Sequence, residues 1–199
     1  MTAHVNRRQF TRGAAWSAPA LSIAAAAPAV AVSPPPPKLT SATFFGQSNV
    51  SGQTVAPYTC NGQQQFQVDG VRSGQFFTVT NTVAGVPITN ITMTFWLATV
   101  AGTTWTRVSG SSTCWSLPTA TGDTTTYGSV LFRAYSSTFN CTAMPSGSTY
   151  TIPTTQMFNF VSSCQGRSSF PTSYYHYTQT ALTRGVSLTK DNGWTNVMV

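Results

Sequence analysis

From Leu39 onward, apolar and polar residues alternate along the chain at every second position. The clearest run is 90–97, in which Ile91, Met93, Phe95 and Leu97 alternate with polar residues at three of the four even positions. A period of two is the pattern of a β-strand with one buried face. The run 127–134 repeats it and predicts that Val130, Phe132 and Ala134 face inward. Further strands are predicted at residues 41–45, 64–68, 75–82, 105–109, 113–117, 157–162, 181–189 and 194–199.

Short glycine-containing segments separate these runs and predict turns. They include Thr121-Gly122-Asp123 and Asp191-Asn192-Gly193. No segment after residue 31 sustains the 3.6-residue period of a helix. The pattern predicts an all-β protein, an antiparallel immunoglobulin-like β-sandwich of roughly 8–10 strands.

The first 31 residues follow a different pattern. Arg7 and Arg8 precede Phe10, an alanine-rich apolar run covers residues 13–30, and Ala29-Val30-Ala31 has the small residues of a cleavage site. This arrangement resembles a bacterial twin-arginine export signal, which implies secretion or display at the cell surface. The alternatives are an amphipathic surface helix and a membrane anchor. The apolar run is short for a spanning helix and is interrupted by prolines.

The chain therefore divides into three parts. Residues 1–31 are the expected signal peptide, residues 32–38 a proline-rich spacer and residues 39–199 the β-sandwich domain. Four consecutive prolines, Pro34 to Pro37, favour a stiff polyproline II segment. The absence of an internal repeat indicates one domain rather than an array of modules.

Two adjacent runs carry a resemblance to a known class of domain. Residues 76–82, Phe-Phe-Thr-Val-Thr-Asn-Thr, lead into residues 88–94, Ile-Thr-Asn-Ile-Thr-Met-Thr. This pair resembles a strand pair of the immunoglobulin-like modules found on bacterial surface proteins. The resemblance covers about twenty residues and implies a β-sandwich at the cell surface.

The charged residues argue against a nucleic-acid partner. Residues 32–199 carry seven basic and three acidic side chains, a net charge of +4, and the basic ones are spread singly. A nucleic-acid-binding surface gathers its basic residues on one face. We therefore expect no nucleic acid, and contact with a membrane only during export.

Four cysteines are widely spaced: Cys60, Cys114, Cys141 and Cys164. No two are close enough for a Cys-x-x-Cys motif, and in an exported protein an even number predicts two disulfides. Three pairings are possible. The sequence-near pairing, Cys60 with Cys114 and Cys141 with Cys164, is the simplest expectation.

Groups suited to catalysis are few. The acids are Asp69, Asp123 and Asp191, each beside or near a glycine, where aspartate commonly bonds its own backbone. His176 is the one histidine after residue 31, and no Gly-x-Ser-x-Gly motif accompanies it. These residues predict a non-catalytic protein without a metal or other cofactor.

Aromatic residues are the candidate binding groups. Trp96 falls among the polar positions of its run, and Trp105 and Trp115 flank a predicted hairpin across which they could lie side by side. Tyr174, Tyr175 and Tyr177 form a run in which consecutive rings point to opposite sides of a strand. Either the run connects a loop to the core, or some of its rings are exposed.

These features predict a non-catalytic secreted or cell-surface β-sandwich with a structural, adhesive or envelope-associated role. The alternative is a carbohydrate-binding module that uses exposed tryptophan and tyrosine rings. The partners expected are a cell-envelope polysaccharide, another surface protein or a second copy of the chain. Self-association would use the segment Leu39 to Phe45 as an added strand at a neighbour's sheet edge.

Overall fold

The computed structural model describes residues 33–41, 45–49, 60, 65–71, 77–165 and 174–196. The chain divides into two compact units, Met1–Pro34 and Pro35–Val199. The second unit is described below. The predicted signal peptide, with Arg7 and Arg8, lies outside the described residues.

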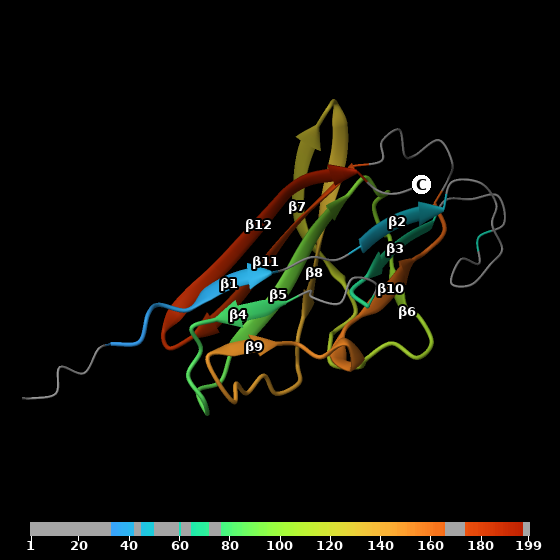
Figure 1. The fold of residues 1–199 in the computed structure, drawn as a ribbon. Helices are drawn as coiled ribbons and strands as arrows, with labels where there is room; N and C mark the ends of the chain where they lie inside the picture. Colours follow the sequence, from blue (N-terminus) through green and yellow to red (C-terminus); the bar gives the residue numbers. More distant parts are fainter. Residues whose placement is uncertain are drawn as a thin grey trace, which may run out of the picture. The chain divides into compact units, whose positions relative to one another are not determined.

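Twelve strands in the described residues form three antiparallel sheets, and the helical content there is one 3-10 turn, η1 (Thr154–Gln156) (Figure 1). The first sheet contains β1 (Lys38–Ser41), β4 (Thr78–Thr80) and β9 (Thr149–Thr151). The second, in spatial order, contains β2 (Phe45–Asn49), β3 (Gln65–Asp69), β10 (Asn159–Ser162) and β6 (Trp105–Arg107). The third contains β12 (Val186–Asn196), β11 (Tyr174–Thr183), β5 (Thr89–Leu97), β8 (Val130–Thr138) and β7 (Thr119–Tyr127). The all-β prediction is confirmed.

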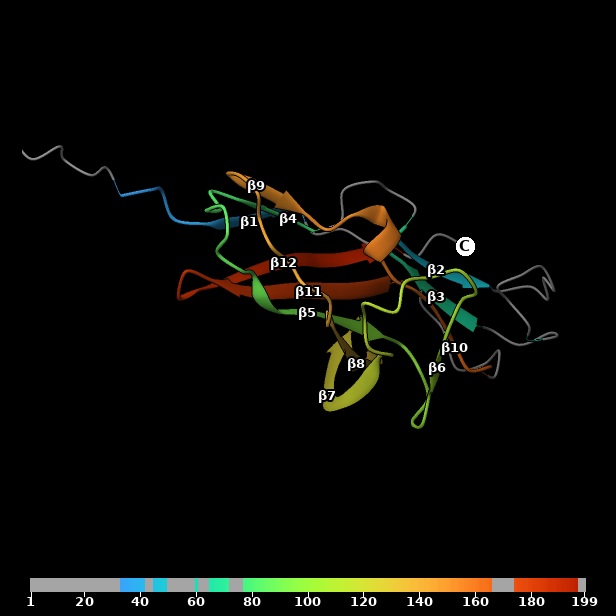
Figure 2. The same ribbon diagram turned by 90° about the horizontal axis from the view of Figure 1, so that it is seen from below.

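One core joins the three sheets. In Figure 2 the β1–β4–β9 sheet lies above β11 and β12 of the five-stranded sheet, and the β2–β3–β10–β6 sheet lies to their right. Alternate residues of β5, from Ile91 to Leu97, are at most 1% exposed, as their period of two predicts. Phe95 meets the edge of the Trp105 ring of β6 at a centroid distance of 5.3 Å. The five-stranded sheet thus packs face to face on the smaller sheets, and we call its core-facing side the inner face.

Two tight hairpins give the five-stranded sheet its shape. Gly128 and Ser129 connect β7 to β8, and Arg184 and Gly185 connect β11 to β12; all four have positive φ. Positive φ at both central residues is the mark of the type I′ hairpin turn. Residues 127–134 and 181–189, each predicted as one strand, therefore each contain a chain reversal.

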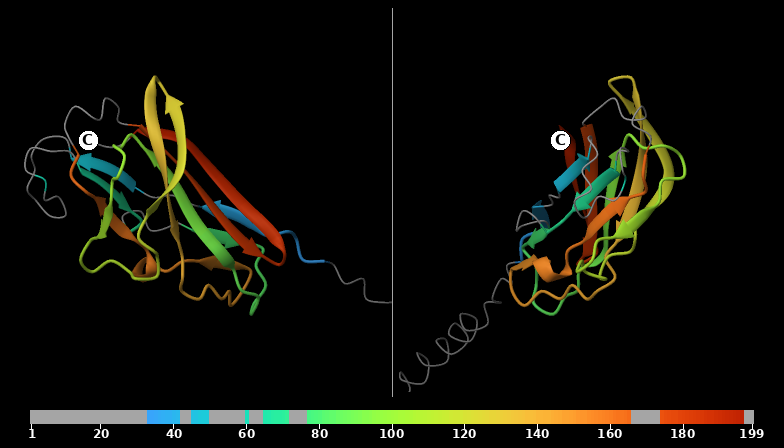
Figure 3. Two further views of the ribbon diagram at one scale, coloured as in Figure 1. Left: turned by 180° about the vertical axis from the view of Figure 1, so that it is seen from behind. Right: turned by 90° about the vertical axis from the view of Figure 1, so that its right-hand side faces the viewer.

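The β7–β8 hairpin projects beyond the neighbouring strands (yellow in Figure 3). Phe132 and Ala134 are buried, as predicted, but they lie on the side opposite the main core. Ala134 is paired with Trp96, and both alternate with residues of the inner face such as Phe95 and Tyr135. The burial of Phe132 and Ala134 therefore shows that part of the outer face is also covered.

The proline-rich segment is held against the strands through its carbonyl groups. Asn81 Nδ2 donates to Pro36 O at 2.9 Å, and Arg184 Nη1 donates to Pro35 O at the same distance. Pro37 is buried. The first strand, β1, then pairs with β4 of the same chain through Lys38–Thr80 and Leu39–Val79.

Candidate functional site

The candidate site lies on the outer face of the five-stranded sheet, where β11 exposes alternate residues. Tyr175 and Tyr177 are each 5% exposed and belong to the core, so His176 between them points to the other side. His176 is paired with Trp96 of β5 on one side and with Trp194 of β12 on the other. These three residues form a row across three strands.

A β-bulge in β12 places an acid beside this row. His176 pairs with Trp194 and Thr178 with Asp191, so Asn192 and Gly193 together oppose Tyr177. Gly193 has a φ of 66°, the left-handed conformation that glycine adopts readily. The prediction that Asp191-Asn192-Gly193 is a turn between strands is therefore wrong. The same residue types form a bulge inside one continuous strand.

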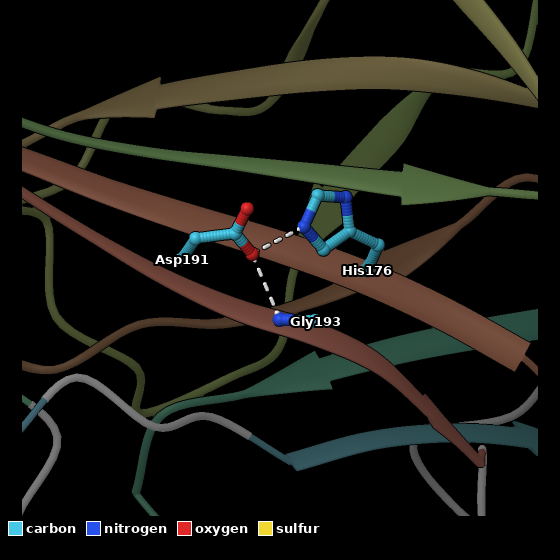
Figure 4. A network of polar contacts seen from close by, with 3 residues as sticks. All are labelled: His176, Asp191 and Gly193. Atoms are coloured by element: carbon cyan, nitrogen blue, oxygen red, sulfur yellow. Dashed lines mark hydrogen bonds and ion pairs between the residues drawn. The ribbon is translucent and has the colours of Figure 1, made fainter.

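The bulge joins Asp191 to His176 (Figure 4). Asp191 Oδ1 accepts from the backbone N–H of Gly193 at 2.8 Å and lies 2.6 Å from His176 Nε2. The histidine side chain is 16% exposed and the aspartate side chain 62% exposed. The Gly193 N–H, followed by the His176 contact, lowers the pKa of Asp191 below its ordinary value.

Aromatic rings surround the histidine on both sides. The Trp96 ring stacks on His176 with centroids 4.8 Å apart, and the Trp194 ring lies 5.2 Å away on a tilted plane. Tyr127, at the end of β7, stacks on Trp194 at 4.4 Å, and Phe132 meets Trp194 edge-on at 4.6 Å. These five side chains, Trp96, Phe132, His176, Trp194 and Tyr127, form what we call the outer aromatic cluster.

This arrangement orients the imidazole, because Nε2 contacts the Asp191 carboxylate and the ring lies between two indoles. The rings lie against one another, so much of their flat surface is already covered. The outer aromatic cluster therefore acts as a local structural support for β12.

The structure places most of the predicted binding rings in the core. Trp105 and Trp115 are 5% and 1% exposed, and Tyr175 and Tyr177 are equally buried, so these rings cannot form an exposed stacking platform. Trp96 is half-buried and lies on the outer face. The side chain of Tyr174 is outside the described residues.

Trp105 and Trp115 also do not lie side by side. Trp105 belongs to β6 and pairs with Ser162, whereas Trp115 forms a bridge with Phe139. The Trp115 indole donates to Gln156 O at 3.0 Å and packs edge-on against Phe158. The hairpin predicted between them is a loop over the core.

Two disulfides are present, as predicted, but with a different pairing. Cys60 is bonded to Cys164 and Cys114 to Cys141. The predicted sequence-near pairing is wrong because the sheet order brings distant segments together. Trp115, which follows Cys114, bridges Phe139 near Cys141, and β10, which precedes Cys164, pairs with β3. Two disulfides indicate an oxidising, extracytoplasmic environment.

The other two acids have local roles. Asp69 is 5% exposed, and its carboxylate accepts from Val71 N at 2.7 Å, as predicted for an aspartate that bonds its own backbone. Asp123 is exposed and accepts from the Thr121 hydroxyl at 3.0 Å. Gly122 between them has a φ of 91° and lies inside β7, where the pairing with β8 shifts register. The turn predicted at residues 121–123 is thus an irregularity within a strand.

The contact between His176 and Asp191 and the part played by Trp194 were not predicted from the sequence. Asp-Asn-Gly is a turn signal, and a bulge that uses the same residues is not distinguishable from it by local pattern. The alternation on the two sides of the motif gives no usable signal, because Lys190 and Thr195 occupy inner positions and Trp194 an outer one.

Comparison of the chain with models of protein families, with curated proteins and with solved structures gives no match. In the described part of the chain, no helix has the length and apolar character needed to span a membrane.

Proposed function

We propose that this chain is a non-catalytic protein of the bacterial cell surface or secreted medium, exported by the twin-arginine route, with a structural, adhesive or envelope-associated role. The observation that carries the proposal is that the few acidic and imidazole side chains of the domain are engaged in contacts within the fold. Asp69 and Asp191 each hold a backbone N–H, and His176 is held between two indoles and a carboxylate. Groups engaged in this way stabilise the backbone.

An immunoglobulin-like arrangement of the sandwich is part of this proposal. Antiparallel sheets packed through one core, short hairpins and a buried tryptophan against a disulfide-bearing segment are compatible with it. Trp115, which follows the disulfide-bonded Cys114, is the buried tryptophan in question.

The edge strand β7 supports an adhesive or self-associating role. All residues of β7 except Thr125 are exposed. Three large side chains near this edge are also exposed: Leu117, which precedes β7, by 43%, Tyr127, which ends it, by 38%, and Leu131 of β8 by 44%. An exposed edge can pair with a strand of another molecule. The segment predicted for this role, Leu39 to Phe45, begins in β1, which is also an edge strand and has four residues. We assign the role to β7 because it has nine residues and is almost fully exposed.

The export part of the proposal is tested in cells that make the full chain. Arg7→Lys combined with Arg8→Lys should abolish recovery of the chain outside the cytoplasm, because the receptor reads the arginine pair. Arg12→Lys is the matched control and should be exported normally. Equal export of the double variant would contradict the twin-arginine assignment.

The role outside the cell is tested by fractionation of the same cultures. We expect the exported chain to remain with the cell envelope or to assemble with itself, as measured by sedimentation and by light scattering of the purified protein. A strictly monomeric protein that is found only in the medium and binds no envelope fraction would contradict the proposal.

Carbohydrate binding is the second candidate, and one observation favours it. A groove beside the irregular part of β7 carries an acidic and a basic side chain on neutral, small-residue walls. Such a lining offers hydrogen-bond donors and acceptors to a neutral polar ligand.

A further inference from the structure

The groove lies between the loop after β5 and the β7–β8 hairpin, and its volume is about 200 Å³. Asp123 contributes a carboxylate from β7 and Arg133 a guanidinium from β8. Its walls are formed largely by small residues: Ala101, Gly102, Ala120, Gly122 and Ala134. The positive φ of Gly122 shapes the strand at this point, so the groove exists because β7 departs from regular pairing.

The floor of the groove is held in place by hydrogen bonds. Arg133 Nη1 donates to Thr99 O at 2.7 Å, and the Tyr135 hydroxyl lies 2.6 Å from Thr99 Oγ1. Thr103 donates to Val100 O at 2.8 Å. A site whose polar groups are already oriented binds with a smaller loss of conformational entropy.

The two charges of the groove are not joined to each other. Among the described residues the one side-chain ion pair is between His176 and Asp191, so Asp123 and Arg133 stand more than 4 Å apart. Asp123 Oδ2 accepts from Thr121, which leaves Oδ1 as an acceptor. The guanidinium of Arg133 has five N–H donors in one plane. One of its nitrogens donates to Thr99 O, and the N–H groups of the other nitrogens remain as donors.

Two other grooves in the described part of the chain lack this combination. One of about 280 Å³ beside Ile88 and Phe139 is lined by uncharged residues. Another, of about 240 Å³ beside Ser111, includes Asp69, whose carboxylate already holds the Val71 N–H. The groove at β7 is distinguished by a carboxylate and a guanidinium among small side chains.

We propose that this groove binds one neutral sugar unit of a cell-envelope glycan. A sugar hydroxyl both donates and accepts, so adjacent hydroxyls can donate to Asp123 and accept from Arg133. The alanine walls suit the C–H face of the ring. A ligand with a single charge would be repelled by one of the two groups, and a zwitterion would lose more hydration on entry. This inference rests on the second function proposed above and gives it a site.

The test is a titration of the disulfide-bonded secreted chain, labelled with ¹⁵N, with glucose, galactose and N-acetylglucosamine, followed by NMR. A single-unit contact is expected to bind at about the millimolar level. Amide shifts should centre on residues 101–103, 120–124 and 133–135 for at least one sugar. Glycine and alanine serve as zwitterionic probes, and shifts with these but not with sugars would overturn the assignment of ligand class.

Variants locate the site. Asp123→Asn keeps an acceptor for Thr121 but removes the charge, and Arg133→Gln removes the planar fork; each should weaken sugar binding by about tenfold. Asp191→Asn and Lys190→Gln make comparable charge-removing changes outside the groove lining and should bind as the parent chain does. Circular dichroism of each variant checks its fold, and Arg133→Lys replaces Arg133→Gln if the latter unfolds.

The outcomes separate the two claims. Sugar binding that survives in Asp123→Asn and in the Arg133 variant would overturn the groove while leaving carbohydrate binding in place. Absence of any binding by the parent chain, to the monosaccharides and to soluble envelope glycans, would overturn both. The proposal of a structural or adhesive surface protein would then stand alone.

Discussion

The two faces of the five-stranded sheet both carry aromatic side chains, but these side chains lie in different surroundings. On the inner face Tyr175 and Tyr177 are sealed in a core that joins all three sheets. One residue away, on the outer face, His176 lies in a partly exposed aromatic cluster with Asp191. The comparison shows that aromatic content alone does not indicate a binding surface. The strand position of each ring decides whether it stabilises the fold or faces a partner.

The largest effect is expected in the core that the inner face covers. Trp115→Ala should lower the free energy of unfolding by about 3–5 kcal/mol, because it removes a fully buried core ring and its hydrogen bond to Gln156 O. Trp96→Ala on the outer face is the matched variant and should cost about 1 kcal/mol, since that ring is half-buried. Urea unfolding measures both. Equal losses would remove the distinction between the core and the outer face.

The disulfides should differ from each other in the same assay. Replacement of Cys60 and Cys164 by alanine opens a link between residues 104 apart, and replacement of Cys114 and Cys141 a link between residues 27 apart. The chain-entropy account predicts a loss of about 2–5 kcal/mol for the longer link and about 1 kcal/mol less for the shorter. A larger loss from the shorter link would show that packing around Trp115 dominates.

A smaller effect is expected at the bulge. Gly193→Ala places a side chain at a φ of 66° and should cost about 1–2 kcal/mol in unfolding free energy. Gly147→Ala is the control and should be near neutral, because Gly147 lacks a positive φ and no neighbouring atom lies within 4 Å of the position that an alanine Cβ would take. If both variants are neutral, the bulge conformation is not required for the stability of β12.

The smallest effect is expected from the exposed acid, and it depends on pH. Asp191→Asn should cost about 0–1 kcal/mol near neutral pH, because a largely exposed pair is screened by solvent. The pKa of Asp191 is lowered in the folded chain, so its contribution is present above its ordinary value of 3.8 and is lost as the pH falls through the lowered pKa. The stability difference between the parent and the variant should therefore shrink as the pH falls below 3.8 and vanish below the lowered pKa. A difference that grows in acid would contradict the assignment.

The period of two was enough to predict the strand class and the inner face of β5. It did not show which side of the sheet a buried residue occupies. Phe132 and Ala134 are buried, yet they lie on the outer face, where Phe132 contacts Trp194 and the β7–β8 hairpin brings Tyr127 against the same ring. That contact depends on the shape of the whole sheet, which local periodicity does not contain.

The candidate sites were less predictable than the strands for a related reason. The contact between His176 and Asp191 depends on a two-against-one pairing in β12, and the groove at Asp123 depends on a similar irregularity in β7. Both motifs, Asp-Asn-Gly and Thr-Gly-Asp, are ordinary turn signals. The disulfide pairing likewise follows from sheet order, because β3 and β10 are neighbours although they are far apart in sequence.

The most direct test of the distinction between core and outer face is hydroxyl-radical footprinting of the purified, disulfide-bonded chain, read by mass spectrometry at Trp96, Trp105, Trp115 and Trp194. The structure predicts that Trp96 and Trp194 are oxidised readily and that Trp105 and Trp115 are protected. Oxidation of Trp105 and Trp115 in the folded protein, with Trp96 and Trp194 protected, would contradict the assignment of the first two rings to the core and the other two to the outer face.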